Sequence, residues 1–190
     1  MTRFAILGPP GSGKSVQARR LAEWLEVPVV STGALLRKID DPGVQEAMAR
    51  GALVDTRIVS QVIARELSKS ETASGFVLDG SPRTLREARM VERNWPLDLF
   101  IHLDVSQNTS IRRLSERQGA RRDDSPDVIF RRVMDYPAMI AEVLYYYQCL
   151  GKLCCVPAEG IPDEVFEFVK KTATGMRCCA RPGRIGRIKA

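Results

Sequence analysis

The stretch Gly8-Pro9-Pro10-Gly11-Ser12-Gly13-Lys14-Ser15 decides how the rest of the sequence is interpreted. It fits the pattern G-x-x-x-x-G-K-[ST], in which a glycine-rich turn folds around phosphate groups. The apolar run Phe4-Ala5-Ile6-Leu7 precedes it and predicts a buried strand, and the residues after it repeat apolar side chains at helical spacing. Strand, glycine loop and helix in this order are the context that the motif requires, so we predict a phosphate-binding loop.

The chemistry of this loop indicates a purine nucleoside triphosphate, usually ATP or GTP. Glycines let successive backbone N–H groups turn toward an anion, and the following helix directs its positive N-terminus at the same point. Lys14 is expected to reach the β- and γ-phosphates, and the Ser15 hydroxyl to help hold Mg²⁺. The residues of this segment that we predict to bind ATP are Gly8, Pro10, Gly11, Ser12, Gly13, Lys14, Ser15 and Val16. The loop alone does not indicate a kinase.

Apolar runs and helical periodicities alternate along the rest of the chain. Further strands are expected at residues 28–31, 75–79, 99–105 and 152–156. Helices are expected at about 16–25, 33–50 (two short ones, broken at 41–43), 58–67, 84–93, 107–118, 126–149 and 162–173. This alternation predicts an α/β fold: a P-loop, doubly wound, five-stranded parallel sheet with helices on both faces. Ligands of such sheets bind beyond the carboxyl ends of the strands, where each motif of this sequence lies.

Length and composition predict one globular domain. The chain has 190 residues, of which 44% are hydrophobic, and no run of about 18 uncharged apolar residues indicates a membrane span. The first residues lead directly into the strand and the glycine loop rather than into a secretory signal, so a cytoplasmic location is expected. The five cysteines are odd in number and show no C-x-x-C spacing. We therefore expect reduced thiols rather than a disulfide framework or a zinc site.

The positive charge of the chain is concentrated at its C-terminus. The net charge is +6, and residues 177–190 carry five basic residues and no acidic one. Residues 1–176 are therefore nearly neutral, so the overall charge does not predict a nucleic-acid-binding domain. We expect a nucleotide-binding domain over residues 1–176 and a basic, disordered tail over 177–190. A function of this tail in binding RNA is the less favoured alternative.

Further motifs give the sequence a specific resemblance. The phosphate loop is followed by Ser31-Thr32-Gly33-Ala34-Leu35-Leu36-Arg37, Gly51-Ala52-Leu53-Val54 and Leu78-Asp79-Gly80-Ser81-Pro82-Arg83-Thr84. A late arginine series comes next: Arg113 and Arg117, then Arg121 and Arg122 before two aspartates, then Arg131 and Arg132. Over residues 3–172 this order resembles the adenylate kinases in their short form. The resemblance implies transfer of the ATP γ-phosphoryl to AMP with Mg²⁺, an acceptor-binding lobe at about residues 32–60 and a short lid at about 117–125. We expect a monomer, because the sequence shows no long unpaired apolar stripe.

The resemblance also implies a role for individual residues. Arginine suits such roles, because its planar guanidinium matches phosphate oxygens and stays charged. Lys14, Arg83, Arg117, Arg121 and Arg132 would act in catalysis, and Asp79 would hold Mg²⁺ through waters together with Ser15. Arg113 would stack on the ATP adenine, Arg117 would contact the ATP phosphates, and the loop at Gly160 and Ile161 would contact the adenine. The acceptor nucleotide would be bound by Thr32, Gly33, Leu36, Arg37, Val54, Gly80, Arg83, Glu87, Arg121 and Arg132.

Two departures from the family pattern bear on the substrates. Ala34 stands where a carboxylate near the metal's water shell is usual. Glu87 stands where the family usually has a glutamine, whose amide donates to adenine N1 and accepts from the N6 amino group. An ionised carboxylate only accepts hydrogen bonds, so it suits the N1–H and N2 amino group of guanine. GMP, CMP or UMP is therefore an alternative acceptor. The other alternative is that the Glu87 side chain faces solvent and has no part in binding the base.

Two further interpretations remain open. A nucleotide-binding regulator that has lost catalysis would explain the departures, although it would not need cations around a transferring phosphoryl group. His102, the only histidine, lies in the middle of an apolar strand. We interpret it as a hydrogen-bonded core residue rather than as a catalytic one.

Overall fold

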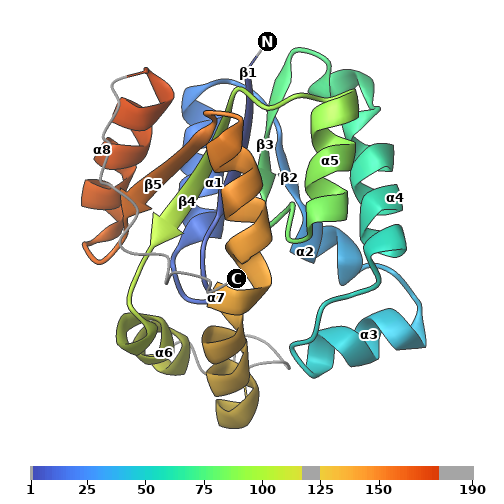
Figure 1. The fold of residues 1–190 in the computed structure, drawn as a ribbon, viewed down its shortest axis with the longest axis vertical. Helices are drawn as coiled ribbons and strands as arrows, with labels where there is room; N and C mark the ends of the chain where they lie inside the picture. The colour runs from blue at the N-terminus through green and yellow to red at the C-terminus, as the bar shows by residue number, and fades with distance from the viewer. Residues whose placement is uncertain (1, 117–124, 176–190) are drawn as a thin grey trace.

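The fold is a five-stranded parallel sheet between two layers of helices (Figure 1). The computed structural model describes residues 2–116 and 125–175. The predicted lid, apart from Ser125, and the predicted tail therefore lie outside the described residues, as do Arg117 and Arg121. The strands are β1 (Thr2–Leu7), β2 (Val29–Ser31), β3 (Gly75–Asp79), β4 (Leu99–Asp104) and β5 (Leu153–Pro157), in the order β2-β3-β1-β4-β5. The predicted fold class is confirmed.

The helices begin and end close to the predicted positions. They are α1 (Lys14–Trp24), α2 (Thr32–Leu36), α3 (Pro42–Ala49), α4 (Thr56–Leu67), α5 (Leu85–Asn94), α6 (Gln107–Glu116), α7 (Pro126–Cys149) and α8 (Pro162–Ala173). A 3₁₀ turn, η1 (Ser70–Thr72), was not predicted. The Asp41 side chain accepts a hydrogen bond from the backbone N–H of Val44, and Pro42 is the first residue of α3. Both residues favour a helix start, which explains the break between α2 and α3.

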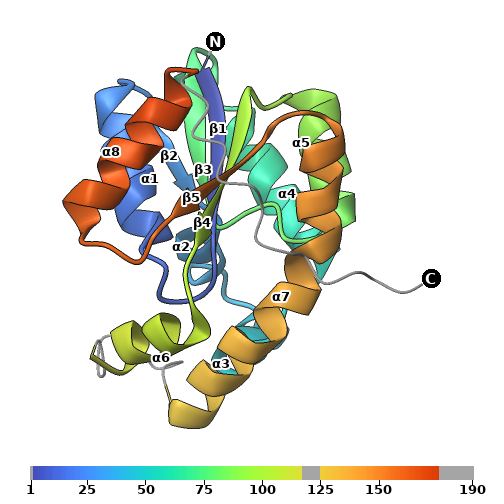
Figure 2. The same cartoon turned by 60° about the vertical axis from the view of Figure 1, so that its left-hand side comes forward.

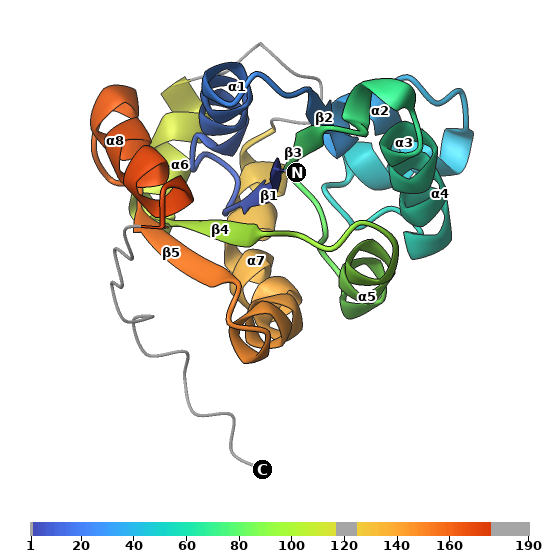
Figure 3. The same cartoon turned by 90° about the horizontal axis from the view of Figure 1, so that it is seen from above.

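The two faces of the sheet bury separate hydrophobic cores. Along β1, Phe4 and Ile6 point to the face that α1 and α8 cover, while Ala5 and Leu7 point to the face that α4, α5 and α7 cover (Figure 3). This alternation follows from the two-residue period of a strand. Phe100 stacks on Tyr147 of α7 with ring centroids 4.3 Å apart. Because both faces are covered, the strands are apolar almost throughout, as the sequence pattern predicted.

The connections of β1 and β3 create a crevice at the carboxyl edge of the sheet. The chain leaves β1 for α1 on one face and leaves the neighbouring β3 for α5 on the other face. Helices α3 and α6 lie beyond this edge (Figures 1 and 2). Such a switch point is where open α/β sheets bind ligands. None of the described helices is long and apolar enough to cross a membrane.

His102 is part of the core, as predicted. Its side chain is 8% exposed, and its Nε2 shares a hydrogen bond of 3.1 Å with the hydroxyl of Tyr136 on α7. Burial lowers the pKa of His102 from 6.5 to about 4, although Asp104 acts in the opposite direction. The histidine is therefore neutral in the folded protein at pH 7 and positions the middle of α7 against β4.

We predict that this burial makes stability depend on pH. Between about pH 6.5 and pH 4 the unfolded chain binds a proton at His102 and the folded chain does not. Stability is fully present above this range and falls as the pH falls, by up to about 3 kcal/mol from this group. Urea denaturation of the wild type and of His102→Gln across this range isolates the contribution. Parallel pH profiles for the two proteins would contradict the assignment.

Candidate functional site

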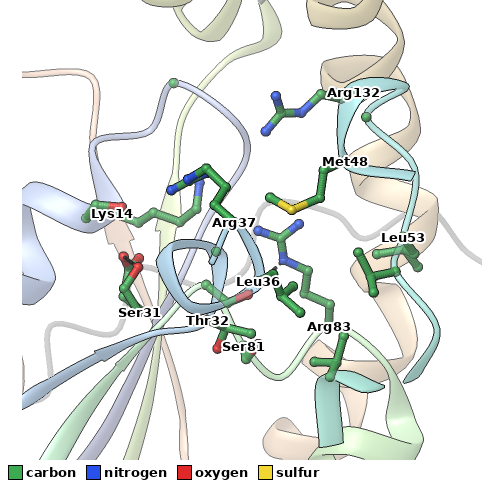
Figure 4. A pocket seen from close by; sticks show the side chains of 18 of the residues that line it. Lys14, Ser31, Thr32, Leu36, Arg37, Met48, Leu53, Ser81, Arg83 and Arg132 are labelled. Carbon is green, nitrogen blue, oxygen red and sulfur yellow. Dashed lines mark hydrogen bonds between the residues drawn. The ribbon is translucent and has the colours of Figure 1, made fainter. Parts of the chain in front are cut away.

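A single cavity occupies the crevice at the carboxyl edge of the sheet (Figure 4). Its volume is about 480 Å³, and residues from β2, β3 and the helices α1 to α7 line it, together with residues of the loops between them. The predicted site residues among its lining are Gly11, Gly13, Lys14, Ser15, Val16, Thr32, Gly33, Leu36, Arg37, Val54, Asp79, Gly80, Arg83, Glu87, Arg113 and Arg132. The fold thus gathers predicted residues that lie up to about 120 positions apart in the sequence.

The phosphate loop forms one wall of the cavity. Gly11 and Gly13 have φ angles of +82° and +85°, a left-handed conformation that glycine adopts without strain. A Cβ atom at Gly11 would lie 2.6 Å from the backbone oxygen of Ser110, so the loop also packs closely on α6. No acidic residue lies in the first turn of α1. The positive end of this helix is therefore directed at the cavity without being neutralised.

Cationic side chains from four elements point into the cavity. Lys14 comes from α1, Arg37 from the end of α2, Arg83 from the loop after β3 and Arg132 from α7 (Figure 4). The Lys14 ammonium donates to the backbone oxygen of Pro9 at 3.3 Å, across the loop that it follows. The Arg83 Nε donates to the backbone oxygen of Gly80 at 2.7 Å, which fixes the direction of the guanidinium. Cations held in this way are suited to binding a chain of phosphates.

Electrostatics show that this cluster is arranged for an anion. Burial lowers the pKa of Arg83, and the nearby Arg132 lowers it further, while Tyr136, Glu87 and Asp79 act in the opposite direction. Two partly buried cations held close together repel each other. An anionic phosphate placed between them removes this repulsion, so the free site already favours a phosphate ligand.

Asp79 provides the carboxylate at the end of β3. It is 5% exposed, and its Oδ2 accepts a hydrogen bond of 2.8 Å from the Ser31 hydroxyl. Within the described residues, its Oδ1 is buried and has no hydrogen-bond partner. Asp79 Oδ1 can therefore accept a hydrogen bond from a water molecule that is bound to Mg²⁺. Such waters are expected, because Mg²⁺ keeps several of them in nucleotide sites. Ser15 of the phosphate loop lines the same cavity.

Arg113 has a function that the sequence did not reveal. Its guanidinium donates to the backbone oxygens of Ala158, Glu159 and Gly160 at 2.8–2.9 Å. The loop that carries Gly160 and Ile161 does not line the cavity itself but is attached to it through this arginine. The three bonds use the edge of the guanidinium, so the stacking of its face on an adenine stays a prediction.

The apolar end of the cavity was only partly predicted. Besides Leu36 and Val54, it is lined by Met48, Leu53 and Val59. The apolar side chains on α3 and α4 were visible in the sequence, but which of them face the cavity depends on how these helices pack on α2. Arg19, one turn after Ser15 on α1, also lines the cavity and was missed. Its spacing of four residues from Ser15 was the available signal.

Glu87 lies at the apolar end, so the expectation that it could face solvent is wrong. It is 2% exposed, because the start of α5 packs under α4. Gly8, Pro10 and Ser12 do not line the cavity, although they belong to the loop that does. Ser12 is 2% exposed, and it supports the turn from within, where its N–H donates to the backbone oxygen of Pro9 at 3.1 Å.

Comparisons with known proteins agree with this geometry. A sequence model of the family described as adenylate kinase matches residues 6–152. An adenylate kinase of Xanthomonas oryzae pv. oryzae (strain MAFF 311018) is 37% identical over 182 residues, which cover 89% of this chain and 97% of the relative. An adenylate kinase of Chlamydia felis (strain Fe/C-56) is 38% identical over 202 residues, with 87% of this chain and 94% of the relative covered.

Gly51 allows Arg132 to reach the cavity, and we predict that Gly51→Ala disturbs it. Gly51 has a φ of +70°, and a Cβ there would lie 2.5 Å from Cγ of Arg132. The left-handed backbone alone costs about 1–2 kcal/mol with alanine. Displacement of Arg132 should in addition weaken ATP binding about tenfold, as expected for one lost charge-assisted contact.

Gly151→Ala is the matched control for this experiment. Gly151 has a φ of +68°, but no atom lies within 4 Å of the position of its Cβ. Both variants should lose similar stability in urea, and only Gly51→Ala should lose affinity for ATP in calorimetry. Equal ATP affinity in the two variants would contradict the role given to Gly51.

Proposed function

Because the chain belongs to the adenylate kinase family, we propose that its cavity holds ATP at the phosphate loop and AMP between α2, α4 and α5. The protein is a nucleoside monophosphate kinase that transfers the γ-phosphoryl of ATP to AMP and gives two ADP. The observation that supports this placement best is the single cavity that joins the phosphate loop to Arg37, Arg83 and Arg132.

On the donor side, the phosphate loop and Lys14 bind the ATP phosphates. Backbone N–H groups and the N-terminus of α1 offset the negative charge, and Lys14 reaches the β- and γ-phosphates. The adenine lies toward Arg113 and the loop at Gly160 and Ile161. Ile161 is 60% exposed, so its side chain is available to pack on a base.

On the acceptor side, the AMP phosphate lies between Arg37 and Arg83, and the base lies in the apolar end of the cavity. Leu36 and Val59 provide flat apolar contact from α2 and α4. The Thr32 hydroxyl is buried without a partner among the described residues, so it can bond to the base. This arrangement puts a phosphate oxygen of AMP next to the γ-phosphate of ATP.

The reaction then needs positioning and cations more than it needs a base. An oxygen of the AMP phosphate forms the new P–O bond to the γ-phosphorus, and the bond from that phosphorus to the β–γ bridging oxygen breaks. The attacking oxygen already carries negative charge, so no proton has to be removed. Lys14, Arg83 and Arg132 stabilise the charge on the transferring group. Arg117 and Arg121 are predicted to assist, and both lie outside the described residues.

Mg²⁺ fits the acidic part of the site. Asp79 and Ser15 would hold it, mostly through waters and the phosphates of ATP. When bound, it would neutralise charge on the β- and γ-phosphates. Ala34 provides no carboxylate at this point, so Asp79 is the acidic side chain that lines the described cavity near the loop.

We further propose that the protein works as a monomer in the cytoplasm. Cys149 and Cys155 carry free thiols, which suits a reducing compartment. Residues 32–60 would act as a mobile acceptor lobe and residues 117–125 as a short lid, which together exclude water from the transfer.

Replacement of Lys14 by alanine tests the proposed function. With γ-³²P-labelled ATP and AMP, the wild type should move label into ADP, and Lys14→Ala should lower kcat at least about a hundredfold by removing a cation from the transferring group. Lys171→Ala, on the exposed side of α8, should leave the rate unchanged. ATP binding without any transfer would support the nucleotide-binding regulator instead, and label in inorganic phosphate alone would indicate an ATPase; either result contradicts the proposed function.

Removal of residues 177–190 tests the domain assignment. We expect the shortened chain to keep the kcat and KM of the full chain, because the nucleotide site lies within residues 1–176. Steady-state kinetics on both proteins measures this, and a gel-shift assay with single-stranded RNA shows whether the tail binds RNA. A loss of phosphoryl transfer on removal would mean that the tail belongs to the catalytic domain.

A further inference from the structure

Glu87 places a carboxyl group where the acceptor base should lie. It is the third residue of α5, whose start is capped by the Thr84 hydroxyl, which accepts a hydrogen bond of 3.3 Å from the Glu87 N–H. Its side chain lines the cavity together with Leu36, Met48 and Val59. A carboxyl group in such surroundings loses its hydration, so each hydrogen bond that it makes there has a large effect on ligand binding.

The Glu87 carboxyl is held by the backbone rather than by a cation. Its Oε2 accepts a hydrogen bond of 2.8 Å from the backbone N–H of Arg83. Among the ion pairs between described residues, none includes Glu87. The bond to the Arg83 N–H fixes the direction of the carboxyl. Each carboxyl oxygen has two lone pairs, so a bond to the backbone still allows a further hydrogen bond to a ligand.

Charged and titratable groups of several elements line the cavity with this carboxyl or interact with the adjacent Arg83. They are Arg83 in the loop before α5, Asp79 at the end of β3, Arg37 after α2, and Arg132 and Tyr136 on α7. Helix α4 contributes the apolar Val59. The three arginines favour the ionised carboxylate. In the proposed function they also bind the substrate phosphates, whose negative charge then offsets their positive charge.

Other side-chain polar groups at this end of the cavity do not distinguish purines. The hydroxyls of Thr32 and Ser81 are buried and have no partner among the described residues. A hydroxyl donates or accepts as needed, so it can bond to either adenine or guanine. The carboxyl differs, because it donates only when it is protonated and otherwise accepts at both oxygens.

The two purines present opposite patterns to such a group. Adenine offers an acceptor at N1 beside the donor N6 amino group, whereas guanine offers donors at N1 and at the N2 amino group. A protonated carboxyl donates to adenine N1 and accepts from N6. A carboxylate accepts both guanine donors and is repelled by the lone pair of adenine N1.

We propose that Glu87 selects the acceptor base by its own protonation, so that the neutral side chain binds AMP and the ionised side chain favours GMP. The proposal rests on the proposed function, since it assumes that the acceptor base lies at the apolar end of the cavity. It makes the preference for AMP over GMP a function of pH.

Burial of Glu87 supports the direction of this effect. It raises the pKa of Glu87 above the ordinary value of 4.5, although the hydrogen bonds from Arg83 and Thr84 and the charge of Arg83 act in the opposite direction. The neutral form therefore persists to higher pH than for an exposed glutamate. Binding of adenine N1 stabilises the neutral form further, by linkage.

Equilibrium binding of AMP and of GMP, each without ATP, tests the proposal between about pH 5 and about pH 9. The ratio of the two affinities removes effects common to both ligands, such as ionisation of their phosphates. In the wild type this ratio should fall about tenfold per pH unit toward GMP above the pKa of Glu87. In Glu87→Gln, whose amide does not titrate but can still accept from the Arg83 N–H, the ratio should favour AMP at every pH.

Each outcome decides a different point. A ratio that changes with pH in the wild type and stays constant in Glu87→Gln supports the proposal. A ratio that is constant in both proteins, or that changes equally in both, overturns it and leaves the proposed function intact. If neither nucleotide binds the wild type at any pH, the acceptor site and with it the proposed function fail. Circular dichroism of Glu87→Gln establishes that this variant is folded.

Discussion

The cations of the cavity repel one another, and the fold has to hold them in place against this repulsion. Lys14, Arg37, Arg83 and Arg132 point toward one space, and each pair at close range costs from about 1 kcal/mol in water to about 4 kcal/mol where water is partly excluded. The chain tolerates this because each cation is anchored on a different element. A ligand with several phosphates converts the repulsion into attraction, so the site is organised before its substrates arrive.

The two hydrophobic cores supply the rigidity that this arrangement needs. The strands that end at the cavity are covered on both faces, and residues such as Ile6 and Leu78 are fully buried. The phosphate loop and the loop after β3 therefore start from fixed positions. The His102–Tyr136 hydrogen bond adds a fixed point between β4 and α7, the helix that carries Arg132.

The fold could be predicted well from the sequence because its signals are local. Every strand was predicted within two residues of its ends, since buried parallel strands are apolar runs bounded by turns. The roles of Arg113 and Glu87 depend on contacts between distant segments. Arg113 bonds to a loop 45 residues or more away, and Glu87 becomes buried only when α4 and α5 pack together. Arg19 was missed because its spacing of four residues from Ser15, which puts both on one side of α1, was not used.

In the proposed function, one cavity holds both nucleotides with their phosphates in contact. A molecule that joins two adenosines through five phosphates would occupy both positions at once, so titration calorimetry with this molecule tests whether the two positions adjoin. We expect one molecule to bind per chain, with an affinity well above those of ATP and of AMP alone. In its presence, neither ATP nor AMP should bind. Two molecules per chain, or continued binding of AMP in its presence, would contradict a shared cavity.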